Sequence, residues 1–215
     1  MTETTKTTNS GGYAGIDERI AAADSPSIWV GDRVHLRGYE PEDLEFETAY
    51  EANTIDQRRG WKAFPPRSSV ARKTWNEEAS AEKPEGDAVQ FRLAIARRSD
   101  NLIVGGVNSH TVNQINGTFR FGISVAEAHK GNGYAGEAVL LLMRYMFEER
   151  RFQKCGSEVA SYNAPSLALH RKLGFVEEGR LRRDVFLGGG FHDTVMFGMT
   201  VEEFRELYPK LRPRL

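Results

Sequence analysis

A glycine-rich hexapeptide at residues 131–136, Gly-Asn-Gly-Tyr-Ala-Gly, separates two segments with different hydrophobic periods. The segment before it alternates apolar and polar residues, which predicts a half-buried strand with an inward row of Phe119, Phe121, Ile123 and Val125. The segment after it predicts an amphipathic helix ending near Arg151, with an apolar stripe of Ala135, Val139, Leu142 and Met146. The chain must therefore turn from strand to helix at the glycines and dock that helix on a sheet.

Such a turn has the parts of a phosphate-binding site. Glycines let the backbone approach an anion closely, and the first N–H groups of a helix lie at the positive end of its dipole. We therefore expect a ligand that carries a pyrophosphate. Taken alone, the glycines could also serve only to turn the chain tightly.

The length of 215 residues suits one domain with a tail. Residues 1–27 are rich in Thr, Ser, Gly and Ala without sustained periodicity, which predicts a flexible extension before a single domain over residues 28–215. The longest apolar run, at 138–143, is too short to span a bilayer, and the N-terminus lacks the basic and apolar regions of a secretory signal. We expect a cytoplasmic protein with no membrane partner.

Charge and cysteine content exclude further classes of function. The 29 basic and 30 acidic residues give a net charge of -1, so the excess of positive charge that most nucleic-acid-binding proteins carry is missing and no nucleic-acid partner is expected. Cys155 is the single cysteine, which excludes an intramolecular disulfide and a cysteine-based metal cluster. We expect a buried thiol and no metal site.

The N-terminal half predicts a strand, two helices and then an antiparallel run. A short strand at Val34 precedes a helix that starts at 40–43 and runs to about Asn53. Residues 58–66 are expected to form a loop, and Ser68 or Ser69 to cap a second helix reaching Ser80. Strands follow at 91–95 and 102–111, the latter with a bulge at 105–106. The Asn-Gly pair at 116–117 predicts a type I′ hairpin turn into the strand before the glycines.

The C-terminal half predicts a strand at 154–160, a short helix at 165–173 ended by Gly174, and a hairpin of 175–186 with 192–199. An amphipathic segment follows Val201. This order of elements predicts an α+β or mixed α/β sheet.

The hexapeptide also matches the GxGxxG pattern of dinucleotide-binding folds, and Glu158 lies at a suitable distance for a ribose contact. Against that alternative, five residues separate Val125 from Gly131, only one βαβ unit is visible, and hairpins lie on both sides.

Residues 163–175, Asn-Ala-Pro-Ser-Leu-Ala-Leu-His-Arg-Lys-Leu-Gly-Phe, supply a second motif after the next strand. Together with Gly-Asn-Gly-Tyr-Ala-Gly-Glu-Ala at 131–138, its Asn-x-x-Ser and Lys-Leu-Gly-Phe elements resemble the signature of the GNAT N-acetyltransferases of the RimJ/RimL type. The resemblance extends more loosely from about Val30 to Met199. It implies the GNAT fold, a mostly antiparallel twisted sheet that is splayed between strands 4 and 5 and flanked by helices.

The resemblance also implies transfer of an acetyl group from acetyl-coenzyme A (acetyl-CoA) to a primary amine, by direct attack in a ternary complex. Ile123, Ser124 and Val125 would pair with the pantetheine arm, and Asn163 would hydrogen-bond it. The pyrophosphate would be held by Lys130, Gly131, Asn132, Gly133, Tyr134, Ala135 and Gly136. The far side of the splay would be lined by Ser166, Leu169 and His170.

The catalytic residues follow less directly from the resemblance. Many relatives carry tyrosine at the position of His170, where it protonates the departing thiolate, and an imidazolium could do the same. Relatives often carry glutamate in the central strand where Arg120 stands here, so the general base cannot be transferred simply. Among Glu127, His110 and Glu158 we favour Glu158, acting directly or through water; the alternative is a solvent-facing charge.

Substrate contacts are expected from residues 58–66 and from the turn at 188–193, because both would overhang the cleft. The candidates are Arg59, Trp61, Phe64, Arg120 and His192, although Trp61 and Phe64 could instead anchor their loop and Arg120 could pair with an acid. The acceptor could be a small amine, an antibiotic amino group or a protein N-terminus. A catalytically silent acyl-CoA sensor is the alternative function. A homodimer could form by strand exchange or packing of the N-terminal segment.

Overall fold

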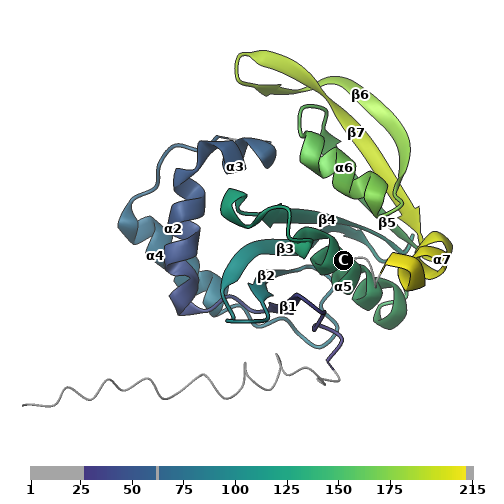
Figure 1. Cartoon of the computed structure of the whole chain (residues 1–215), viewed down its shortest axis with the longest axis horizontal. Helices are drawn as coiled ribbons and strands as arrows, with labels where there is room; N and C mark the ends of the chain where they lie inside the picture. Colours follow the sequence, from purple (N-terminus) through teal and green to yellow (C-terminus); the bar gives the residue numbers. More distant parts are fainter. Residues whose placement is uncertain (1–26, 62, 212–215) are drawn as a thin grey trace, which may run out of the picture.

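The computed structural model of the chain describes residues 27–61 and 63–211. Seven strands form one sheet in the order β1-β2-β3-β4-β5-β7-β6 (Figure 1). The strands are β1 (Val34–Arg37), β2 (Phe91–Arg97), β3 (Ile103–Asn113), β4 (Thr118–Val125), β5 (Lys154–Ala160), β6 (Val176–Leu187) and β7 (Gly190–Thr200). Neighbouring strands are antiparallel except β4 and β5, which run parallel. The predicted mixed, mostly antiparallel sheet is confirmed, and the dinucleotide-binding alternative, which requires a parallel sheet, is wrong.

The parallel pair of β4 and β5 comes apart after three residues. Residues 118–120 pair with residues 154–156, and beyond Arg120 and Gly156 the two strands have no common ladder. From there β4 pairs only with β3, and β5 only with β7. The predicted splay is therefore present, and it opens toward the ends of the strands from which the two motif loops leave.

Helix α5 (Tyr134–Arg144), continued by a π-helical turn at Tyr145–Glu149, packs across β1 to β4. Its apolar stripe is buried in the main core, where Phe119 packs edge-on against Phe147. Helix α7 (Val201–Leu211) joins the same core through Phe204, which packs against Phe147. The stripe expected from the sequence thus docks α5 on the sheet.

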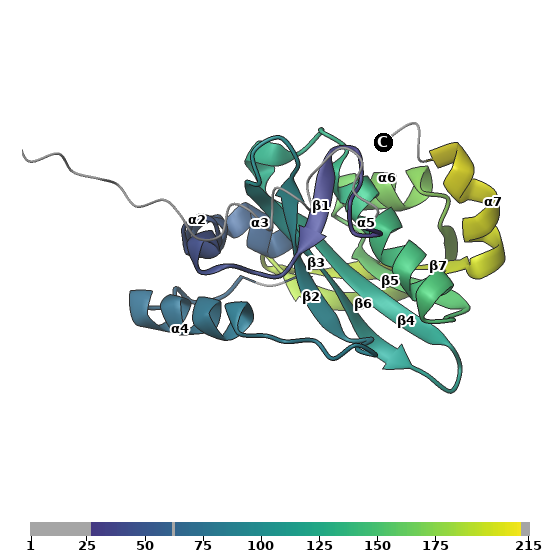
Figure 2. The ribbon, with the colours of Figure 1, turned by 90° about the horizontal axis from the view of Figure 1, so that it is seen from below.

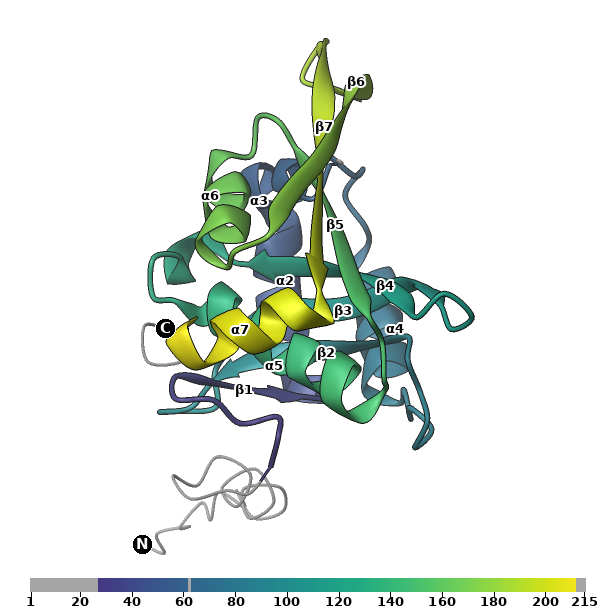
Figure 3. The same cartoon turned by 90° about the vertical axis from the view of Figure 1, so that its right-hand side faces the viewer.

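Three helices lie on the side of the sheet opposite to α5, as Figures 2 and 3 show from two directions. They are α2 (Leu44–Ala52), entered through a 3-10 turn at Pro41–Asp43, α3 (Thr54–Arg59) and α4 (Ser69–Ser80). Ser68 caps α4 by accepting a hydrogen bond from the Ala71 N–H at 3.1 Å. The structure therefore has three helices where the sequence predicted two. The additional helix, α3, is capped by the Asn53 side chain, and it makes residues 58–59 helical rather than loop.

Two further predictions concern a bulge and a turn. The bulge predicted at 105–106 in β3 is present one residue earlier. Gly105 and Ile103 pair with consecutive residues of β2, so Val104 between them has no partner in that strand. The type I′ turn is wrong: of the Asn-Gly pair only Gly117 has a positive φ, of 62°. Residues 114–117 form a longer loop, in which the Asn113 side chain accepts a hydrogen bond from the Asn116 N–H. That bond stabilises the wider turn.

Helix α6 (Ala164–Lys172) follows β5. Leu173 is its C-cap residue, and Gly174 comes next with a φ of 86°. The β6–β7 hairpin projects beyond the rest of the sheet (Figure 3). No helix in the described part of the chain combines the length and apolar character needed to cross a bilayer.

Candidate active site

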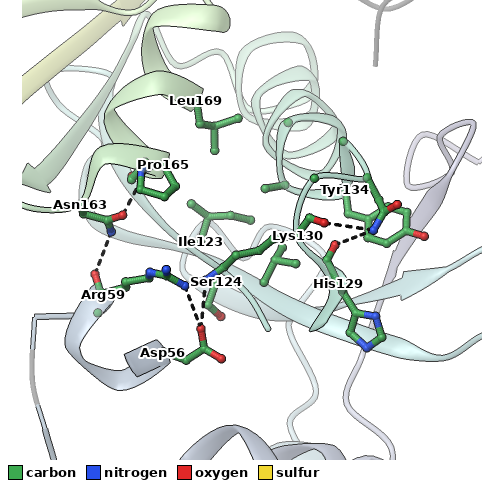
Figure 4. Close-up of a pocket in the computed structure, with 18 of the residues that line it drawn as sticks. Asp56, Arg59, Ile123, Ser124, His129, Lys130, Tyr134, Asn163, Pro165 and Leu169 are labelled. Carbon is green, nitrogen blue, oxygen red and sulfur yellow. Dashed lines mark hydrogen bonds and ion pairs between the residues drawn. The ribbon is translucent and has the colours of Figure 1, made fainter. Parts of the chain in front are cut away.

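A cavity of about 260 Å³ lies at the mouth of the splay, between the loop after β4 and helix α6. Every cofactor residue predicted from the sequence except His170 lines it: Ile123, Ser124, Val125, Lys130, Gly131, Asn132, Gly133, Tyr134, Ala135, Gly136, Asn163, Ser166 and Leu169. Figure 4 shows labelled members of this set around the cavity. The fold thus brings together the two motifs that the sequence separates by about thirty residues.

The loop geometry suits a phosphate group. Gly131 and Gly133 have φ values of 83° and 81°, which side-chain-bearing residues rarely adopt. The Asn132 side chain donates to the carbonyls of His129 and Lys130 at 3.1 and 3.3 Å and so fixes the loop. Gly133 caps α5, whose first-turn N–H groups have no acceptor within the helix. These donors at the cavity wall fit a pyrophosphate.

Two cations and two carboxylates join α3 to this loop. The Lys130 ammonium binds Asp56 at 3.0 Å and Glu127 at 2.7 Å, and Arg59 pairs with the same two acids. Asp56 is buried, and it also accepts a hydrogen bond from the Glu127 N–H. Lys130, predicted to hold phosphate, is thus positioned in the cavity by Asp56, a residue that the sequence did not single out.

The C-terminal end of α3 is also bound to the turn after β5. Tyr162 donates its hydroxyl proton to the Arg58 carbonyl at 2.8 Å, and Asn163 donates to the Arg59 carbonyl at 3.2 Å. Asn163 also caps α6 by accepting from the Ser166 N–H. Helix α3 therefore bridges the open end of the splay, from the β4 side to the β5 side (Figure 1). Asn163, expected to bind pantetheine, here holds two helices in place.

A second cavity, of about 530 Å³, adjoins the first. Both are lined by Arg59, Gly60, Ile123, Asn163 and Ser166, so they meet at the splay. The second cavity contains the two predicted catalytic residues, His170 and Glu158, and the predicted substrate residue Trp61. The remaining lining comes from Asn108, His110, Phe121, Gly122, Ser157 and Val159.

His170 is only 1% exposed and is fully engaged by its surroundings. Its Nδ1 lies 2.8 Å from the Ser166 carbonyl oxygen, which only accepts, so Nδ1 carries the proton. Its Nε2 lies 2.8 Å from the Ser157 hydroxyl, which donates to it. Burial lowers the pKa of His170, and the bond to the Ser166 carbonyl opposes that shift. At neutral pH the resting imidazole is therefore uncharged.

Ser157 is a site residue that the sequence analysis missed. Residues Cys155, Ser157 and Val159 alternate as buried positions of β5, so a hydroxyl among them faces the interior. That alternation could have identified Ser157 from the sequence, because a polar residue on a buried strand face needs a hydrogen-bond partner.

Glu158 points away from Ser157, as successive strand residues do. Its carboxylate forms an ion pair with Arg120, which lies beside it across the end of the β4–β5 ladder. The predicted substrate residue Arg120 therefore binds the predicted base, which was one of the alternatives for it. Nearby, His110 bonds its neighbour Thr111 at 2.9 Å.

Two other predicted substrate residues lie outside both linings. Phe64 is 59% exposed and lines neither cavity. His192 donates to the Leu187 carbonyl at 3.1 Å and packs edge-on against Tyr162. It thereby supports the tyrosine that binds α3.

Comparison with known proteins agrees with this geometry. A family model described as an acetyltransferase (GNAT) domain matches residues 33–176. The chain is 39% identical to the SPbeta prophage-derived uncharacterized N-acetyltransferase YokL of Bacillus subtilis, over 83% of this chain and 96% of that protein. It is 31% identical to the spermidine N(1)-acetyltransferase of Vibrio cholerae, over 50% of this chain and 61% of that protein.

Solved structures share the fold. A crystal structure of spermidine N-acetyltransferase from Vibrio cholerae in complex with CoA and spermine superposes with a TM-score of 0.66 at 23% identity, covering 80% of this chain and 98% of that one. The family match covers well over half of the chain, and it includes the splay, the glycine loop and helix α6. The chain therefore belongs to the GNAT family of acetyl-CoA-dependent N-acetyltransferases.

Proposed function

We propose that the protein moves the acetyl group of acetyl-CoA to a primary amine, on a small molecule or a protein N-terminus, by direct attack in a ternary complex. The observation that carries this proposal is the pair of cavities that meet at the splay and share one wall. One has the donors for a pyrophosphate and the other has titratable side chains. Donor and acceptor can therefore be bound at the same time.

The edges of the splayed strands support the position of the cofactor arm. Beyond Arg120, β4 has no ladder to β5, so its backbone groups on that side are available for the pantetheine amides. An arm that starts at the glycine loop and runs back along Val125, Ser124 and Ile123 brings its thioester toward the apex of the splay. N–H groups of the same strand are suited to stabilise the oxyanion.

In this scheme His170 returns a proton to the coenzyme thiolate, and Glu158 is the candidate base for the amine. Both line the cavity assigned to the acceptor. His170 is uncharged at rest, so the proton that it donates must reach it during the reaction. Acetyl-CoA, when bound, would supply the activated thioester, with the thiolate of coenzyme A as its leaving group.

The acceptor class is supported by the relatives, which include spermidine acetyltransferases. The resemblance to RimJ/RimL enzymes supports a protein N-terminus instead. Spermidine, kanamycin and the tripeptide Ala-Gly-Gly represent the three classes of acceptor in a thiol-release assay. The catalytically silent acyl-CoA sensor is favoured by the Arg120–Glu158 ion pair, which occupies the candidate base. Tight cofactor binding without turnover of any of these acceptors would support it.

The test is thermal unfolding with acetyl-CoA, NAD or ATP, because a ligand that binds only the native state raises its stability. We expect a rise in Tm with acetyl-CoA alone. Gly131→Ala should reduce that rise. Gly189→Ala is the matched control, since Gly189 has nearly the same φ, 84° against 83°, and equally open surroundings, but lies in the β6–β7 turn. No rise with acetyl-CoA, or a rise with NAD instead, contradicts the proposal.

A further inference from the structure

A serine hydroxyl, an imidazole and a carbonyl oxygen lie in series at the apex of the splay. Ser157 donates to His170 Nε2, and His170 Nδ1 donates to the Ser166 carbonyl, each at 2.8 Å. Ser157 is the first residue of β5 beyond its ladder with β4, and Phe121 is the corresponding residue of β4. The series therefore begins where the two strands separate, at the wall of the second cavity.

Aromatic rings hold the imidazole in one orientation. The His170 ring stacks on Phe121 and Phe197, with centroid distances of 5.6 and 5.1 Å, and meets Phe175 edge-on at 5.2 Å. The ring cannot turn away from Ser157 without breaking these contacts. Its apolar surroundings favour the uncharged form, which is able to accept a proton at Nε2.

The other ionisable groups around the second cavity are engaged elsewhere. Arg120 and Glu158 pair with each other on the opposite face of the strands. Arg59 pairs with Glu127 and Asp56, and His110 bonds Thr111. Behind His170 on α6, the exposed Arg171 pairs with Glu177. Of these groups, only His170 forms a hydrogen bond with Ser157, of 2.8 Å.

Building on the proposed acetyl transfer, we propose that Ser157 and His170, rather than Glu158, take the proton from the attacking amine and return it to the sulfur, acting together as a proton shuttle. Ser157 is then a catalytic residue that contacts the reacting atoms. His170 acts through it as the proton reservoir.

The proton balance is closed within the site. The free amine attacks the thioester carbon, a C–N bond forms, and the carbonyl electron pair moves to oxygen. The nitrogen gives a proton to Ser157 Oγ while the Ser157 hydroxyl proton moves to His170 Nε2. The oxyanion then reforms the carbonyl and the C–S bond breaks. The sulfur takes the Ser157 proton, and Ser157 recovers one from His170. Amide and coenzyme A thiol leave, and both side chains are restored.

The experiment compares wild type with Ser157→Ala, His170→Gln and the double variant, using whichever of spermidine, kanamycin and Ala-Gly-Gly wild type acetylates fastest. Each single variant should lose about 100-fold or more in kcat. The double variant should lose no more than the worse single one, because both changes break one chain. Losses that multiply, or a Ser157→Ala enzyme with the wild-type kcat, would overturn the shuttle.

A pH profile separates this role from a structural one. Because His170 must be uncharged to accept, log kcat/KM of wild type should fall more steeply in acid than protonation of the acceptor alone explains. Burial lowers the pKa of His170, so this limb should lie below the ordinary histidine range. Ser157→Ala should lose this extra limb. Retention of the limb in Ser157→Ala assigns the proton to another group and rejects the shuttle.

Ser109→Ala is the matched control, because Ser109 is a similarly buried strand serine, 4% exposed against 5%, that lies outside both cavities. It should keep the wild-type pH profile.

Acetyl-CoA should still raise the Tm of every variant, which shows that the cofactor site is intact. Wild type that binds acetyl-CoA but acetylates none of the three amines contradicts the proposed function. Turnover in wild type with an unchanged Ser157→Ala contradicts only the shuttle. Protein that gains an acetyl group from acetyl-CoA alone would show an acyl-enzyme and also overturn it.

Discussion

Glu137 is a carboxylate on the apolar face of α5, and it stabilises the turn before β1. It is 7% exposed and accepts hydrogen bonds from the N–H groups of Asp32, Arg33 and Val34, the latter two at 2.9 and 3.1 Å. Gly31 lies so close that a Cβ there would collide with this side chain. A negative charge inside the helix stripe is thus compensated by three backbone donors.

We expect Glu137→Gln to lower the free energy of unfolding by about 2 kcal/mol, because a neutral amide cannot accept all three bonds and its NH2 group faces backbone donors. Urea unfolding measures the loss. Glu148→Gln, on the exposed end of the same helical segment, is the control and should change stability little. Equal stability of Glu137→Gln and wild type would show that the turn does not depend on the charge.

At the scale of elements, α2 carries a carboxylate with an unusual titration. Burial raises the pKa of Glu47 to about 7, Asp43 adds to the rise, and Arg67 opposes it. The native state therefore binds a proton between the ordinary carboxyl pKa and about 7, where the unfolded chain has released it. This contribution to stability is present at acidic pH and is lost as the pH rises through 7.

Glu47→Gln should therefore be more stable than wild type at pH 8, by on the order of 1–3 kcal/mol, and the difference should fall below about 1 kcal/mol at pH 5. Thermal unfolding of both proteins across this range is the measurement. The neighbouring Glu45→Gln, at an exposed position of the same helix, serves as the control. A gain at pH 8 that persists unchanged at pH 5 would assign the effect to packing rather than to titration.

Helix α3 shows what sequence periodicity misses at this scale. It has six residues, too few for an apolar stripe to emerge, and its stability comes from the Asn53 cap and from bonds to Lys130, Tyr162 and Asn163. These partners lie far along the chain, so no local pattern predicts them. The longer helix α5, in contrast, was predicted because its stripe repeats over several turns.

At the scale of the whole molecule, the described fold begins with residues that contact its centre. Trp29 packs against Tyr145 and Phe91, and its carbonyl accepts a hydrogen bond from the Leu36 N–H at 2.9 Å. The Ile28 carbonyl accepts a bond from Arg144. The N-terminal extension predicted over residues 1–27 lies, apart from Ser27, outside the described residues.

We propose, as the sequence predicts, that the folded domain begins at about residue 28. A chain that starts at Ser27 should unfold within about 2 °C of the full chain, which corresponds to less than about 1 kcal/mol. A chain that starts at Gly31 lacks the Trp29 contacts and should lose about 2 kcal/mol or more. Calorimetry of the three chains measures both effects. A large loss in the chain from Ser27 would show that the preceding residues belong to the domain.

The sequence by itself determined the elements whose signals are local. Alternation set the strands, the helical stripe set α5, and the glycine loop together with the motif at 163–175 indicated a phosphate-binding acetyltransferase site. Through a resemblance carried by neighbouring residues, it also predicted that His170 would line the splay, and His170 lines the second cavity there. In each of these cases the information lies within a few turns or one strand of chain.

Only the tertiary structure decided which partners each site residue has. It placed Ser157 against His170, Arg120 against Glu158, and Lys130 between Asp56 and Glu127. It also made Asn163, a predicted cofactor residue, a link between α3 and α6. These contacts join residues 3 to 104 positions apart, and several lie beside the point at which β4 and β5 separate, after Arg120 and Gly156. The separation of two strands is set by packing on both sides of the sheet, which no segment of sequence encodes alone.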